Sequence, residues 1–187
     1  MEHMLASGVG VEPDLIRASA LFERAAAAGD AFAAFNLASM LRRAAGDGDR
    51  VVELLRQASA GGVAEASLML ATRAADRGFE AEARGLYELA ATQGSAEAMP
   101  LLAVRYRDGI GGAVSRVEAL RWFLKMLDHG NGDGVHEAMS LARMMHPTDI
   151  LRAAELAGRS ADAPMRTGTR PPCPRWTCSQ PVGQAGT

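Results

Sequence analysis

The chain has 187 residues, a length typical of one domain, and 48% of them are hydrophobic although only 5% are aromatic. Apolar content of this kind, mostly Ala, Leu, Met and Val, favours closely packed helices over a sheet and indicates an all-α fold. Twenty basic and 22 acidic residues give a formal net charge of -2. This balance argues against nucleic acid as the main partner, because a phosphate backbone requires a basic surface.

No targeting or membrane segment is recognisable. The first residues lack the basic stretch and apolar run of a secretory signal, and no apolar run reaches the length of about 18 residues that spans a bilayer. We therefore expect a cytoplasmic protein without a membrane span. Cys173 and Cys178 are the only cysteines and lie near the C-terminus, so we expect packing, not disulfides or zinc, to stabilise the fold.

Glycine and proline breaks divide the chain into short segments whose apolar residues recur at spacings of three and four, as on one face of a helix. In the first such segment Ala18, Leu21 and Phe22 follow this spacing. The expected helices are 15–28, 31–45, 50–60, 64–77, 80–93, 95–108, 116–129, 136–145 and 149–158. Because every link is short, neighbouring helices must run antiparallel.

Several residues are expected to set the helix ends. Gly29 can end its helix in the left-handed conformation, and Asp49 can cap the helix 50–60. Pro100 either lies in the first turn of its helix, where a missing amide costs little, or kinks a helix that begins at Ser95.

A motif, Ala-Ala-x-x-Gly followed by x-Ala-x-x-x-Leu, recurs along the chain. Its copies begin at Ala25, Ala58 (with Ser59 as second residue) and Ala90, and the Leu-Ala pair returns at Leu141. The four Leu-Ala pairs are spaced 33, 32 and 39 residues apart. A period in the low thirties predicts stacked helical hairpins. We expect an array over 1–159 with about four units, the first truncated, and a disordered Pro- and Gly-rich tail over 160–187.

The segment 8–37, with its Gly-x-Gly-Val turn, Asp14 and the first Ala-Ala-x-x-Gly, resembles the Sel-one-like repeat, a relative of the tetratricopeptide repeat. A second, degraded turn at 109–112 leads to Trp122 and Phe123, the aromatic pair typical of that family. The resemblance covers about 2–145. It implies a right-handed α-solenoid of antiparallel hairpins whose concave face binds proteins, and a non-enzymatic scaffold or adaptor role.

In such stacks the first helix of each hairpin lines the concave face. Aligned on the Leu-Ala pairs, the outward positions that we assign to partner binding are Phe32, Ser39, Arg42, Arg43, Glu65, Thr72, Asp76, Glu97, Val104 and Arg107. We expect a protein or peptide segment to bind there, the arginines pairing with carboxylates and Phe32 acting as an apolar anchor. The alternative is that these positions are ordinary solvated ones and that Phe35, beside them, belongs to the core.

The remaining signals do not point to chemistry. The segment 128–137 gathers metal-capable groups but has neither the ligand order of a calcium loop nor two histidines at helical spacing. The turn at 109–112 follows no strand, so we interpret it as a hairpin turn and not as a phosphate site. The sequence therefore predicts no catalytic residue, metal or cofactor. The alternatives are a variant that binds a small ligand, such as a cell-wall fragment, or acts on it as an enzyme, and a fragment of a longer array.

The last expected helix is interpreted as the polar cap that the end of a repeat array requires. Leu151, Ala154 and Leu156 are expected to pack on the array. The charged residues Arg152, Glu155 and Arg159 are expected to face water.

Overall fold

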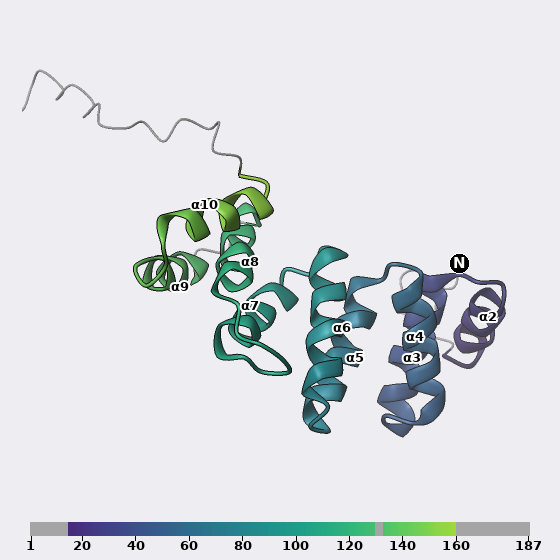
Figure 1. Cartoon of the computed structure of the whole chain (residues 1–187). Helices are drawn as coiled ribbons and strands as arrows, with labels where there is room; N and C mark the ends of the chain where they lie inside the picture. The colour runs from purple at the N-terminus through teal and green to yellow at the C-terminus, as the bar shows by residue number, and fades with distance from the viewer. Residues whose placement is uncertain (1–14, 130–132, 160–187) are drawn as a thin grey trace, which may run out of the picture.

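The structure, a computed structural model, describes residues 15–129 and 133–159, and the regular elements within these ranges are all α-helices (Figure 1). They are α2 (Leu15–Ala27), α3 (Ala31–Ala45), α4 (Asp49–Ala60), α5 (Ala64–Asp76), α6 (Glu80–Thr92), α7 (Ala98–Asp108), α8 (Arg116–Asp128), α9 (Asp133–Ala142) and α10 (Pro147–Leu156). The expected tail 160–187 lies outside the described residues.

The helices stack along the chain as a solenoid, with α3 beside α4 and α5 beside α6 (Figure 1). Helices α7 and α8 form a third hairpin, and each second helix also packs against the first helix of the next pair. The last two helices differ, because α9 and α10 both pack against α8. The predicted α-solenoid of stacked hairpins is confirmed.

The repeated Ala-Ala-x-x-Gly motif ends a helix and turns the chain. Gly29 has φ +93°, its N–H donates to the Ala26 carbonyl at 3.0 Å, and the Asp30 N–H donates to the Ala25 carbonyl at 3.0 Å. This pair of bonds is the Schellman motif, which requires the left-handed conformation that glycine adopts without strain. The same bonds occur at Gly62, Gly78, Gly94 and Gly158. The motif therefore satisfies carbonyls that each helix end would leave unbonded.

The second carbonyl of the motif also accepts a side chain from the following unit. Gln57 Nε2 donates to the carbonyl oxygen of Ala26 at 2.6 Å. Gln93 Nε2 donates to the carbonyl oxygen of Ser59 at 2.9 Å. Both contacts join one second helix to the end of the previous one, so polar bonds accompany the apolar packing between units.

Four helix starts, those of α4, α7, α9 and α10, differ from the sequence-based prediction. Helix α10 begins at Pro147, which was expected to be a break. Asp49 is the first residue of α4 and does not cap it, since Gly48 occupies the cap position without a side-chain bond. The carboxylate still lies at the positive end of the helix dipole. Helix α7 begins at Ala98, whose N–H donates to Ser95 Oγ at 3.2 Å, so Pro100 lies in the first turn and no kink is required.

Helix α9 begins at Asp133, earlier than the predicted start at 136. The prediction counted Gly134 as part of a break. In the structure a Cβ at this position would lie 3.0 Å from the Phe123 carbonyl oxygen. Gly134 therefore allows α9 to approach α8 closely inside a continuous helix.

Buried side chains form two clusters along the array. One contains residues between Ala18 and Leu70, and the other contains residues between Ala71 and Ala153. Leu86, partly buried, packs against both. Trp122 and Phe123 are among the largest fully buried side chains, so the aromatic pair serves the core of the second cluster.

The packing face of α10 was predicted incorrectly. Leu151 and Leu156 are 39% and 40% exposed, whereas Ala153 and Ala157 are buried. Small alanine side chains let α10 lie close to α8, and this closeness rotates the larger leucines away from the contact. Outside this contact, Arg159 Nη2 lies 2.7 Å from Asp128 Oδ1 and ties the end of α10 to the end of α8.

Candidate binding surfaces

The ten residues predicted to bind a partner lie on α3, α5 and α7 or directly before α7, and most of them are exposed. Phe32 is 69% exposed, an unusual value for a large aromatic side chain. The other exposed members are Arg42, Arg43, Glu65, Thr72, Asp76 and Glu97. Ser39, Val104 and Arg107 are partly buried.

Arg107 is already paired within the chain. Its Nη1 lies 3.0 Å from Glu137 Oε2 on α9, and its Nε lies 2.8 Å from Asp108 Oδ1. The hydrogen bond from Arg107 lowers the pKa of the Asp108 carboxyl, so this pair persists to lower pH than an isolated carboxylate would allow. Arg42 and Arg43, by contrast, form no ion pair with any residue in the ranges 15–129 and 133–159.

Two members of the predicted set are engaged in local structure. Val104 packs against the second core cluster. The Thr72 hydroxyl donates to the Leu68 carbonyl at 3.0 Å, as threonine commonly does inside a helix. Phe35, which the sequence left between core and surface, is partly buried against the first core cluster. The exposed members of the set therefore lie on α3 and α5 and directly before α7, whereas the members within α7 are partly buried.

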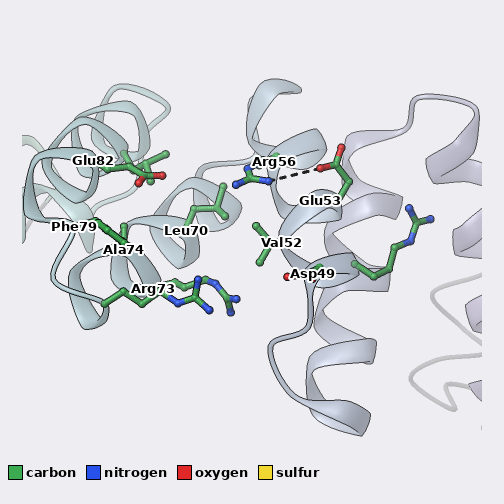
Figure 2. A pocket seen from close by; sticks show the side chains of 12 residues that line it. Asp49, Val52, Glu53, Arg56, Leu70, Arg73, Ala74, Phe79 and Glu82 are labelled. Carbon is green, nitrogen blue, oxygen red and sulfur yellow. Dashed lines mark ion pairs between the residues drawn. The ribbon is translucent and has the colours of Figure 1, made fainter.

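The sequence did not predict a groove on another side of the array. A groove of about 710 Å³ lies between α4 and α6, over the C-terminal half of α5 (Figure 2). Its apolar lining consists of Val52, Leu70, Ala74, Phe79 and Leu86. Four arginines also line it, Arg50, Arg56, Arg73 and Arg77, together with the carboxylates of Asp49, Glu53 and Glu82.

The arginines of this groove differ in how they are held. The side chain of Arg73 is only 16% exposed, and its Nη1 lies 3.1 Å from the Asp47 carbonyl oxygen and 3.5 Å from Asp47 Oδ2. Arg56 lies 3.8 Å from Glu53, and both side chains are mostly exposed. For Arg77 no carboxylate among the described residues is within ion-pair distance. The end of the groove near α5 therefore has cationic groups available.

In the described part of the chain, no three His, Cys, Asp or Glu side chains come together in a way that could hold a metal ion. None of the helices in these ranges is long and apolar enough to cross a membrane. The segment 128–137 was expected to be a loop and not a metal site, but Asp128 ends α8 and residues 133–137 belong to α9, whereas 130–132 lie outside the described residues.

Comparison with known proteins places these observations in a family context. The family model of the Sel1 repeat matches residues 3–30, 80–95 and 96–131. A Sel1 repeat protein from Oxalobacter formigenes is 30% identical with a TM-score of 0.58, and the match covers 64% of this chain and 95% of that one. No curated protein matches the chain in sequence.

A second solved structure is longer than this chain. It is c5321, a protective antigen present in uropathogenic Escherichia coli strains that displays an SLR fold. The two are 26% identical with a TM-score of 0.64, and the match covers 83% of this chain but 35% of c5321. The chain thus spans about a third of the length of that relative.

Proposed function

Because the chain belongs to the Sel1 repeat family, we propose that it is a non-enzymatic scaffold whose first helices bind a segment of a partner protein. Sel1 repeats generally mediate protein–protein interactions, and the family is generally non-catalytic. The proposal assigns this role to the exposed face of α3 and its continuation along α5 and α7.

The Arg107–Glu137 ion pair is the observation that carries this assignment. It joins α7 to α9, two consecutive first helices, through an outward position of α7. Consecutive first helices therefore contribute side chains to a shared surface. On α3 this surface ends in Phe32, which is mostly exposed, and in two arginines without ion pairs in the described part of the chain. An apolar anchor near the start of α3 and guanidinium groups in its last turn, about 15 Å away along the helix, suit an extended segment that carries carboxylates.

Affinity capture with a paired variant tests the proposal. The change Arg42→Glu with Arg43→Glu reverses the charge of the exposed end of α3 and is expected to abolish recovery of partners that wild-type protein retains. A control with Arg143→Glu and Arg152→Glu introduces the same charge change on exposed residues of the last unit. Mass spectrometry compares the three captures, and circular dichroism checks the fold. Equal recovery by both double variants would show that α3 is not the binding surface.

A further inference from the structure

The groove between α4 and α6 has a filled counterpart in the next unit. Ala74 lies four residues after Leu70, and Tyr106 lies four residues after Leu102, so both residues occupy the same repeat position. Ala74 lines the groove (Figure 2), whereas the larger Tyr106 packs against the second core cluster. The groove is therefore open at the place where the following unit carries a phenol ring.

The surroundings of Tyr106 show what this position holds. The guanidinium of Arg84 lies 5.1 Å from the centre of the Tyr106 ring, and the Tyr106 hydroxyl donates to Glu88 Oε2 at 3.2 Å. The positions equivalent to Arg84 and Glu88, 32 residues earlier in the preceding unit, are occupied by Val52 and Arg56. Both of these residues line the groove. An aromatic ring in the groove would contact the apolar side chain of Val52 where Tyr106 contacts Arg84. It would have the cation of Arg56 nearby where Tyr106 has the carboxylate of Glu88.

A pair of arginines confirms the alignment of the two units. Arg73 and Arg105 occupy the same repeat position, and their side chains are 16% and 13% exposed. Each lies 3.5 Å from a carboxylate near the start of the preceding second helix. For Arg73 this is Asp47, just before α4, and for Arg105 it is Glu80, the first residue of α6. Because both units build a similar contact at this arginine, the exchange of tyrosine for alanine is a local difference between corresponding places.

We propose that this groove binds a second partner segment, in which an aromatic side chain takes the place that Tyr106 fills in the next unit and a neighbouring carboxylate contacts the groove arginines. The ring packs on Val52, Leu70 and Leu86, and removes their apolar surface from water. The surface is lined mainly by second helices and by α5, so it is separate from the α3 surface and goes beyond the function proposed above.

Charge complementarity favours an acidic segment over a basic one. Glu53 is paired with Arg56, and Asp49 and Glu82 lie in the first turns of α4 and α6, where the helix dipole already stabilises a negative charge. Arg77 lies at the C-cap of α5 without a carboxylate partner in the described ranges. A carboxylate on the ligand can accept charge-assisted hydrogen bonds from this guanidinium.

Nuclear magnetic resonance titration of the full chain with short peptides tests the proposal. The probe is N-acetyl-Glu-Phe-Glu-amide, and its controls replace either the phenylalanine by alanine or both glutamates by glutamine. We expect the probe to shift backbone amides near Val52 and between Leu70 and Phe79 in a saturable manner. Both control peptides are expected to bind at least about tenfold more weakly. Absence of saturable shifts at these amides would overturn the proposal, as would equal binding of the glutamine or alanine peptide.

Two variants separate this groove from the rest of the molecule. Ala74→Tyr places the ring of the next unit into the groove and is expected to abolish probe binding, and Arg77→Gln is expected to weaken it about tenfold. Arg42→Glu with Arg43→Glu is expected to leave probe binding unchanged, so failure of the α3 proposal and failure of this one are distinguishable. If Ala74→Tyr does not fold by circular dichroism, Arg77→Gln decides. Wild-type affinity in a folded Ala74→Tyr, or in Arg77→Gln, contradicts the proposal.

Discussion

The hydroxyl oxygens of Ser59 and Ser67 lie 2.7 Å apart in the interior, at the junction of α4 and α5. Ser67 donates its one proton to Gln93 Oε1 at 2.6 Å, so Ser59 must be the donor to Ser67. Gln93 in turn donates to the Ser59 carbonyl. This closed ring of hydrogen bonds joins the ends of two successive second helices through the first helix between them.

Removing the central hydroxyl should therefore be costly. Ser67→Ala leaves Gln93 Oε1 and the Ser59 hydroxyl without their partner, and a buried unsatisfied group costs about 1 to 3 kcal/mol. Urea unfolding followed by circular dichroism measures the loss. Ser140→Ala, on an exposed position of α9, is the control and should change stability by less than about 0.5 kcal/mol. An equal effect of both changes would mean that the ring does not stabilise the fold.

Leu70 and Leu102, the leucines of two of the four Leu-Ala pairs, should respond differently to truncation. Leu102 is fully buried, whereas Leu70 is 7% exposed and lines the groove. We expect Leu102→Ala to cost about 3 to 5 kcal/mol and Leu70→Ala about 2 kcal/mol, because a cavity at the edge of the groove is partly open to solvent. Denaturant unfolding of both variants gives the comparison. A loss below about 0.5 kcal/mol for Leu70→Ala would contradict the repeat alignment.

Substitution of two glycines with positive φ distinguishes two contributions to the loss of stability, the strain of the left-handed backbone and the steric clash of an added Cβ. Gly29 and Gly111 have φ +93° and +76°, but a Cβ at Gly29 would meet nothing, whereas one at Gly111 would collide with the Glu80 carbonyl. We expect Gly29→Ala to cost about 1 to 2 kcal/mol from the left-handed conformation alone. Gly111→Ala should cost more, because the turn after α7 must also move away from α6. Thermal unfolding ranks the variants, and the reverse order would be inconsistent with this close approach.

Tyr106 should ionise above the usual pH for tyrosine. Partial burial raises its pKa, and so do the charge of Glu88 and the hydrogen bond to it. The stability from the neutral phenol is complete below a pH of about 10, the pKa of an unfolded tyrosine, and is lost as pH rises through the folded-state pKa. Glu88→Gln should lower this pKa toward the ordinary value.

Tyrosinate absorbance measures this titration most directly in a Tyr87→Phe background, because the chain contains only two tyrosines. Glu155→Gln, on an exposed residue of α10, serves as the control and should leave the curve in place. An unchanged curve in Glu88→Gln would show that the carboxylate does not set the pKa.

The period of the sequence predicted most of the fold. Repeated glycines and the Leu-Ala pairs placed α3 at its observed bounds and located the other helices within a few residues. The errors arose where a residue acts through a distant contact. The sequence predicts a break at Gly134 because the packing of this residue on α8 is invisible in sequence. It predicts a core position for Leu151 because hydrophobicity does not show which face of α10 approaches α8.

The groove could in principle have been found from the same alignment. Comparing Ala74 with Tyr106 shows that the earlier unit lacks an aromatic side chain at this repeat position. This difference creates a groove only if the side chains around Ala74 lie close together in space. Sequence alone does not show that Val52 and Arg56 on α4 face Ala74 on α5. The Arg107–Glu137 pair was likewise hidden, since it depends on how consecutive first helices approach each other.

The glutamine side chains that bond the preceding helix end determine how such an array can grow. In the first two copies of the Ala-Ala-x-x-Gly motif the acceptor is the second carbonyl, whereas the donor comes from within α4 at Gln57 and from just beyond α6 at Gln93. Because the acceptor position is the same in both cases and the position of the donor glutamine varies, neighbouring units can be exchanged without loss of this bond. Gain or loss of one whole unit by recombination would thus keep a carbonyl acceptor in place for the glutamine of the next unit, whereas gain or loss of part of a unit would leave a partly buried amide without its acceptor.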